Sequence, residues 1–348
     1  MKVSMAIAGI GAQCSIGLSA PAVAAAAAGA INRFQFDEHI RSGRTGAHLT
    51  CAWLDTLPER SMGADRMQPL ALAAADEAIE MMPELANVPL PVLLALPAPR
   101  PGFDDEAGKR LAHAIIQALP ISVDKRLCSM VLEGHAGGVM LLLEAERLLV
   151  AGVAPAVLLG GVESYRDLAA LRFIEQTGRL RTEDDALGWI PGEGASFLLL
   201  TTRMRAERLG VSPVMTLDAV ATSIEPMPWY SGQPTIGAGL TEALRAALGE
   251  PGVRVEVYCD LNGEPWRADE WAYAYLRTAV HYVEPLAITH PADCWGDVGA
   301  ASGPMLIALA VEQMINDRSA STRALVWTAS DTNPNRAACV VTDNGARS

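Results

Sequence analysis

Long apolar runs separated by glycine-rich turns give this chain its first structural signal. From Val131 to Glu163 the sequence predicts the end of a buried strand, a sharp turn, a long helix and a second buried strand. The helix, from Gly138 to Val150, is apolar nearly all round, which predicts an interior position. His135 stands in the turn before it, where free N–H groups and the helix dipole favour negative charge. We expect a reactive geometry at that turn.

The same order of elements recurs near the C-terminus. Strand, glycine-rich turn, apolar helix and strand are predicted there at Leu286–Thr289, 296–303, Pro304–Ile315 and Ala324–Thr328. In this reading Gly134-His135 and Gly296-Asp297 take equivalent places in the two copies. Such repetition predicts two similar α/β halves, each offering one polar residue to a shared centre.

The rest of the chain alternates short apolar runs with amphipathic ones, which favours a layered α/β architecture. Further strands are predicted at 3–8, 88–96, 126–133, 195–201, 213–220, 253–261 and 339–342, and helices at 67–82, 105–119, 240–248 and 269–280. A charged excursion at 164–187 and a loop at 226–237 are where we expect partner contacts. We assign residues 1–210 to the first half and 211–348 to the second.

Composition narrows the class of protein. Half of the 348 residues are hydrophobic, and the net charge of −13 without any Lys/Arg run argues against nucleic-acid binding. No apolar stretch is long enough to insert into a membrane, and the N-terminus lacks a signal-peptide pattern, so we expect a cytoplasmic protein. The six cysteines show no metal-ligand spacing, which predicts reduced thiols, no bound metal and no cofactor.

Several motifs, in order and spanning nearly the whole chain, resemble the thiolase-like superfamily and especially its β-ketoacyl synthase branch. They are AGIGA at 8–12, AVLLGGVE at 156–163, WIPGEGASFLLLTTRMRAERLG at 189–210, IGAGLTEALRAAL at 236–248, DLNGEPWRADEWA at 260–272 and GDVGAASG at 296–303. The resemblance implies a five-layered αβαβα fold made of two pseudo-symmetric halves. It also implies a homodimer that pairs through a strand of the N-terminal half.

The resemblance also implies where the catalytic residues should be. In the family, a Cys at the start of the central helix is acylated and two His residues assist decarboxylation. The matching positions here are His135 for the Cys, Asn262 for the first His and Asp297 for the second. Cys128 lies inside the preceding strand, too early to replace the nucleophile. Condensation by the family's route therefore lacks both its thiol and its imidazole pair.

Three functions are compatible with these replacements. We favour a catalytically inactive ketosynthase-like protein that acts as a scaffold, chaperone or partner subunit, accessory to a biosynthetic or bacterial secretion gene cluster. It would form a homodimer, or a heterodimer with an active synthase. The first alternative is an altered acyl-thioester hydrolase or acyltransferase with His135 as general base, Asp297 as its orienting acid and Asn262 as a polar donor. The second alternative is a protein that binds an acyl group or coenzyme A without chemistry.

We expect Glu133, Glu264 and Asp331 to add acidity near the pocket formed by these residues. The simplest arrangement has His135 hydrogen-bonded to Asp297 in a pocket filled by side chains.

Overall fold

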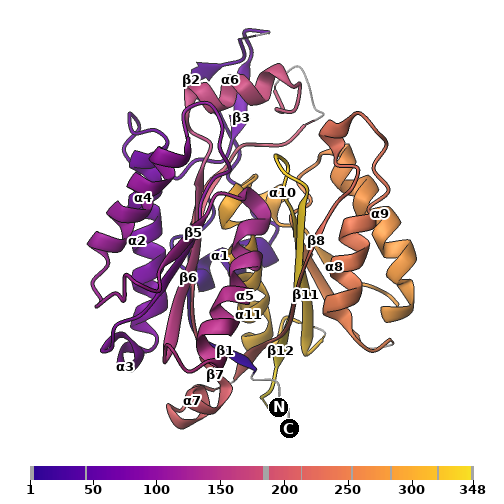
Figure 1. Cartoon of the computed structure of the whole chain (residues 1–348). Helices are drawn as coiled ribbons and strands as arrows, with labels where there is room; N and C mark the ends of the chain where they lie inside the picture. Colours follow the sequence, from indigo (N-terminus) through magenta and orange to yellow (C-terminus); the bar gives the residue numbers. More distant parts are fainter. Residues whose placement is uncertain are drawn as a thin grey trace.

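Helices and sheets alternate as layers across the molecule in the computed structural model, which describes residues 4–345 apart from 44, 183–187, 213, 252–253, 283 and 320 (Figure 1). Two outer groups of helices flank two sheets, and a third group lies between the sheets. The outer helices are α2 (Ala64–Glu80) and α4 (Asp105–Ala118) on one side, and α8 (Ala238–Leu248) and α9 (Pro265–Thr278) on the other. The central helices are α1 (Ala20–Ala28), α5 (Gly137–Val150) and α11 (Ser302–Ile315). The expected five-layered αβαβα architecture is confirmed.

The strands of the two halves follow one scheme. Outward from the middle, the first half has β1 (Met5–Cys14), β7 (Glu193–Thr202), β6 (Ala156–Ser164), β4 (Val92–Ala95) and β5 (Ser129–Val131). The second half has β8 (Met215–Ile224), β12 (Asn335–Asp343), β11 (Arg323–Ala329), β9 (Glu256–Cys259) and β10 (Ile288–Thr289). In each half the first three strands pair antiparallel and the last three pair parallel. The two halves are therefore pseudo-symmetric.

A short antiparallel pairing joins the two sheets into one. Met5, Ala6 and Ile7 of β1 pair with Leu217, Thr216 and Met215 of β8, which gives a continuous ten-stranded sheet. The boundary that we placed at residue 210 stays a prediction; α7 (Arg203–Arg208) lies just before it and β8 just after.

A small unit covers one end of the layers, at the top of Figure 1. It contains β2 (Gln35–Arg41), β3 (His48–Cys51) and α6 (Leu168–Gln176), with β2 and β3 forming a separate two-stranded sheet. The predicted excursion at 164–187 contains α6, and its last five residues lie outside the described part of the chain. Residues 213 and 253, where two strands were predicted to begin, also lie outside it. The remaining short helices are α3 (Pro83–Ala86), α10 (Ala292–Trp295) and the 3-10 turns η1 (Gly134–Ala136), η2 (Trp229–Ser231), η3 (Ala279–His281) and η4 (Gly299–Ala301).

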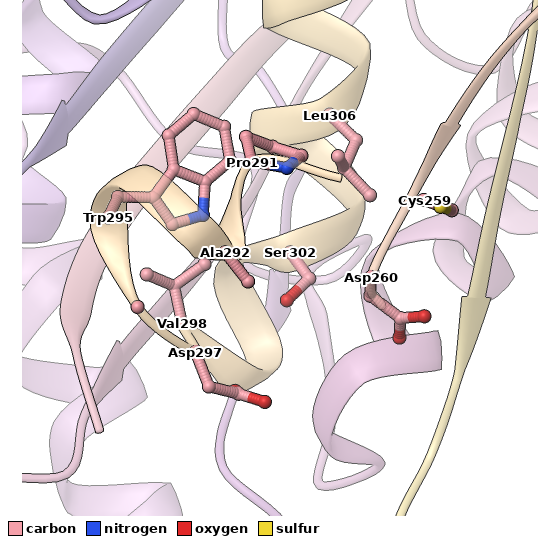
Figure 2. Close-up of a pocket in the computed structure, with 10 residues that line it drawn as sticks. Cys259, Asp260, Pro291, Ala292, Trp295, Asp297, Val298, Ser302 and Leu306 are labelled. Atoms are coloured by element: carbon pink, nitrogen blue, oxygen red, sulfur yellow. The ribbon is translucent and has the colours of Figure 1, made fainter. Parts of the chain in front are cut away.

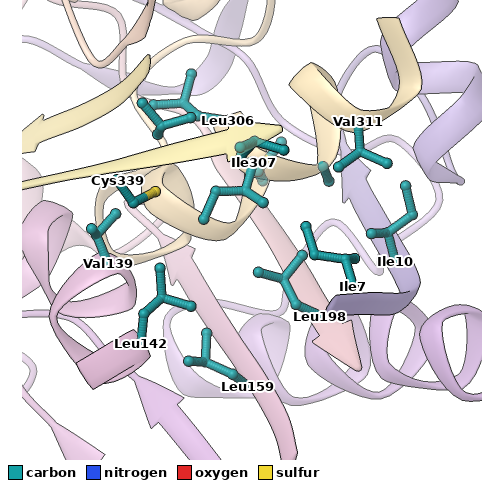
Figure 3. Close-up of a cluster of buried hydrophobic side chains, with 14 of the residues drawn as sticks. Ile7, Ile10, Val139, Leu142, Leu159, Leu198, Leu306, Ile307, Val311 and Cys339 are labelled. Carbon is teal, nitrogen blue, oxygen red and sulfur yellow. The ribbon is translucent and has the colours of Figure 1, made fainter. Parts of the chain in front are cut away.

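The largest apolar cluster surrounds two of the central helices, α5 and α11. Figure 3 shows Val139 and Leu142 of α5 and Leu306, Ile307 and Val311 of α11 among side chains from the sheet. The helices approach closely because Gly138 has no side chain: an added Cβ would lie 2.3 Å from Cδ of Pro304. This contact sets the distance between the N-terminal ends of α5 and α11, where the candidate site lies.

The turns before these helices correct one expectation. Gly134 (φ 60°) opens η1 before α5, and Gly299 (φ 43°) opens η4 before α11, with matching backbone angles on either side. The backbone equivalent of His135 is therefore Ala300. Asp297 lies two residues before the second turn, so its predicted equivalence to His135 is wrong. Gly296 also has a positive φ, 76°, but it precedes this turn, and in the sequence both Gly296 and Gly299 are glycines that could open it.

No helix in the described ranges is both long enough and apolar enough to cross a membrane.

The close approach at Gly138 can be tested with Gly138→Ala. The added methyl group would push against the Pro304 ring, so we expect the free energy of unfolding to fall by about 1–3 kcal/mol. Urea unfolding followed by circular dichroism measures this change. Gly29→Ala is the matched control, because the atoms nearest to its added Cβ lie at 3.5 Å or beyond. Equal stability of the two variants would contradict the packing described.

Candidate functional site

The three residues expected at the site come together at the N-terminal end of α5. His135 lies in η1, Asn262 follows β9, and Asp297 lies between α10 and η4. The Nε2 atom of His135 is 2.9 and 3.0 Å from the two carboxylate oxygens of Asp297. The side-chain amide of Asn262 donates to Asp297 Oδ2 at 2.6 Å, and the N–H of Gly299 donates to Oδ1 at 2.8 Å. Asp297 is thus the acceptor on which the site converges.

A second carboxylate faces the other side of the imidazole. Nδ1 of His135 lies 3.6 Å from Oδ1 of Asp331, which follows β11. Asp331 in turn accepts a hydrogen bond from Arg179 at 2.8 Å. Glu264 receives two hydrogen bonds from Arg179, at 2.5 and 3.0 Å. Two of the three acids expected near the pocket are therefore present, whereas the carboxylate of Glu133 accepts from Asn335 instead.

Arg267 completes the set. Its guanidinium donates to Asp260 at 2.9 Å and to Glu264 at 3.4 Å. Together His135, Arg179, Arg267, Asp260, Glu264, Asp297 and Asp331 form what we call the ion-pair network. Neither arginine was expected from the sequence. Arg179 lies outside the motifs above, and Arg267 lies within the motif at 260–272, where nothing in the sequence shows that its side chain is buried.

Burial and charge decide the protonation of the network. Burial alone lowers the pKa of His135, but the carboxylates of Asp297 and Asp331 outweigh it and raise the pKa to about 10. Burial raises the pKa of Asp297, yet His135 and Arg267 bring it down to about 2. For Asp331 the burial effect is overcome by Arg179 and His135, which hold its pKa well below the usual range. The imidazole is therefore a buried cation between two carboxylates at neutral pH.

Little free space adjoins this cation. His135 is 1% exposed and Asp297 is 4% exposed. A cavity of about 10 Å³ lies beside Asp297 and is also lined by Asp260 and Ser302 (Figure 2). That volume suits about one water molecule. A hollow of about 530 Å³ borders Asn262 and Glu264 further out, and His135 is not among the residues that line it.

About half of the chain is similar in sequence to a known polyketide synthase protein. No family model matches the chain. The actinorhodin polyketide beta-ketoacyl synthase 2 of Streptomyces coelicolor is 31% identical over 193 residues, which cover 51% of this chain and 46% of that protein. The match therefore spans less than half of the relative's length.

Solved structures share the fold over nearly the whole chain. The ishigamide ketosynthase/chain length factor has a TM-score of 0.70 at 20% identity, covering 98% of this chain and 100% of that one. A type II polyketide ketosynthase, solved in complex with its acyl carrier protein, has a TM-score of 0.78 at 14% identity, covering 99% and 100%. The chain therefore has the layered fold of these ketosynthase structures.

The ion-pair network predicts a specific dependence of stability on pH. The folded pKa of His135, about 10, lies above its ordinary value of 6.5, so its stabilisation is complete below pH 6.5 and lost as pH rises to about 10. The folded pKa of Asp297, about 2, lies below 3.8, so its stabilisation is complete above pH 3.8 and lost as pH falls. Their joint contribution should be greatest between these limits.

Chemical unfolding at a series of pH values measures this profile. We expect His135→Gln to remove the decline in stability above pH 6.5, because glutamine cannot hold the proton. His113→Gln, at an exposed position on α4, is the control and should keep the decline. The same slope in the His135→Gln protein as in the unaltered chain would show that His135 is not a buried cation.

Proposed function

We propose that this chain is a non-condensing ketosynthase-like subunit that acts in the cytoplasm by binding another protein, an active ketosynthase being the favoured partner. The observation that carries the proposal is the residue at the start of the central helix. A buried, ion-paired imidazole occupies the turn where the resemblance expects a nucleophilic thiol. Such a group holds the two halves together and offers no atom for acylation.

The cysteines of the chain support a role without acylation. All six are free, and none belongs to the ion-pair network. Burial raises the pKa of each thiol, for example to about 12 at Cys14 and to about 11 at Cys294, the thiol nearest in sequence to Asp297. Because the thiolate is the nucleophile, a raised pKa leaves these groups unreactive near neutral pH.

The geometry also favours this role over the altered hydrolase. A general base needs a free lone pair, but Nε2 of His135 is bonded to Asp297 and Nδ1 points at Asp331. With both nitrogens facing carboxylates, the protonated ring is the stable form. Substrate would also have to displace the ion pairs before reaching the ring.

Protein pairing is supported by the similar proteins and by an open sheet edge. One similar structure is a ketosynthase/chain length factor, and another was solved with its carrier protein. In the described part of this chain, β5 pairs with β4 on one side only, and Ser129 on it is exposed. Exposed N–H and C=O groups on an edge strand favour the addition of another strand. We place the partner at β5, in agreement with the pairing strand that the resemblance implies.

Intact-mass spectrometry tests the absence of acylation. Incubated with malonyl and acetyl thioesters of coenzyme A, the purified chain should gain no acyl group, because no thiol is activated. His135→Cys is the informative comparison, since it restores a thiol at the helix N-terminus. Stoichiometric acylation of the unaltered chain would refute the proposed role, and so would thioester turnover that disappears in His135→Ala.

Pairing can be tested by co-expression with the ketosynthase whose gene lies nearest. Size-exclusion chromatography with light scattering should show a 1:1 pair. We expect Ser129→Lys to weaken it about tenfold or more, because a charge on an edge strand opposes strand addition. Ala246→Lys, on the exposed face of α8 in the other half, should have no effect.

A chain that self-associates, or stays monomeric, in the presence of that ketosynthase would contradict the heterodimer. Self-association weakened by Ser129→Lys would indicate the homodimer instead.

A further inference from the structure

We infer that Arg179 is a latch that holds the loop 226–234 closed over the ion-pair network, and that its release makes His135 accessible. Arg179 belongs to the short segment after α6, in the first half, whereas loop 226–234 and Asp331 belong to the second half. The side chain therefore reaches from one half to the other across the candidate site.

The backbone of Arg179 is firmly anchored on its own side. Its carbonyl accepts from the N–H of Trp189 at 2.9 Å, and the N–H of Arg181 donates to the carbonyl of Trp189 at 3.0 Å. Leu180 forms a bridge with Trp189, and Leu49 forms one with Thr182. These contacts fix the point from which the guanidinium extends.

On the far side, the guanidinium meets two carboxylates and an indole. It bonds to Glu264 and Asp331, as described above, and its central carbon lies 4.8 Å from the centre of the Trp229 ring. The indole N–H of Trp229 donates to the backbone carbonyl of Asp331 at 2.7 Å. Trp229 also stacks with Trp266, with 6.4 Å between ring centres. Trp229 is therefore held by Arg179, Asp331 and Trp266 together.

Loop 226–234 has little else to hold it. Its backbone hydrogen bonds, such as the one from the N–H of Ser231 to the carbonyl of Pro228, are local. Within the described residues, the hydrogen bond from Trp229 to Asp331 is the one that connects the loop to a distant segment. Tyr230 next to it is 45% exposed. A segment with so few buried contacts opens locally when its main contact is lost.

The position of Asp331 shows what the latch controls. Nδ1 of His135 has no hydrogen-bond partner although the residue is buried, and it lies 3.6 Å from Asp331 Oδ1. The other oxygen of that carboxylate is held by Arg179 at 2.8 Å. Removing Arg179 would release the carboxylate of Asp331 and take away the cation that packs on the Trp229 ring, so that the loop can open and uncover this side of the imidazole.

Hydrogen exchange measured by mass spectrometry tests the latch in the full chain. In Arg179→Ala we expect amide exchange in residues 226–234 to rise about tenfold or more, with α5 and α11 unchanged. Arg147→Ala is the matched control, because it removes an exposed arginine paired only with Glu144 and should leave the loop unchanged. Trp229→Phe keeps an aromatic ring but loses the N–H that donates to Asp331, and should also raise exchange in the same loop. It supplies the test if Arg179→Ala does not fold.

Unchanged exchange in 226–234 of a folded variant would overturn the inference, and so would an equal rise in α5 and α11. The experiment contains no partner protein. Its outcome is therefore independent of whether the chain binds a ketosynthase.

Discussion

A charged imidazole in the interior constrains everything around it. Leaving such a cation unpaired away from water costs several kcal/mol, so each neighbouring charge has to be matched. The same rule holds elsewhere in this protein, where buried Arg66, Arg100 and Arg336 face Glu193, Glu163 and Glu270. At His135 the matching acids come from the second half of the chain. The ion pairs therefore serve as cross-links between halves that otherwise meet mainly through apolar helices.

Because of these ion pairs, the turn before the central helix presents no free side chain. In a catalytic turn, a side chain at a helix N-terminus must remain free to meet a substrate. Here the imidazole of His135 is hydrogen-bonded within the chain. The small remaining cavity lies beside Asp297. The chain has the fold of the ketosynthase structures, and the side chain at the start of its central helix is buried among ion pairs. A shared fold does not by itself carry an activity.

The elements predicted most accurately are those whose structure follows from the local pattern of apolar and polar residues. Helix α11 was expected at 304–315 and spans Ser302–Ile315. Its surface is apolar nearly all round, which predicts a helix in the protein interior. The lengths of short parallel strands were overestimated. A strand was expected at 126–133, whereas β5 spans Ser129–Val131. Apolar residues there pack under helices without continuing the ladder.

The site was only partly predictable. His135, Asn262 and Asp297 could be found because their motifs resemble a known family. Arg179 and Arg267 could not, since their burial depends on partners set by the tertiary fold, such as Asp331, which lies 152 residues from Arg179. The mistaken equivalence of His135 and Asp297 has a similar cause. A glycine with positive φ looks the same in sequence whether it opens a turn or merely precedes one.

The seam between the two sheets also bears on how the chain is made. Strand β1 is synthesised long before its two neighbours, because β7 begins at Glu193 and β8 at Met215. While the residues between β1 and β7 are being synthesised, both edges of this apolar strand lack their partners. Such a nascent strand is a natural binding site for a chaperone and a source of aggregation when none is present. Strand β1 is thus paired on both edges only after β8 has been made.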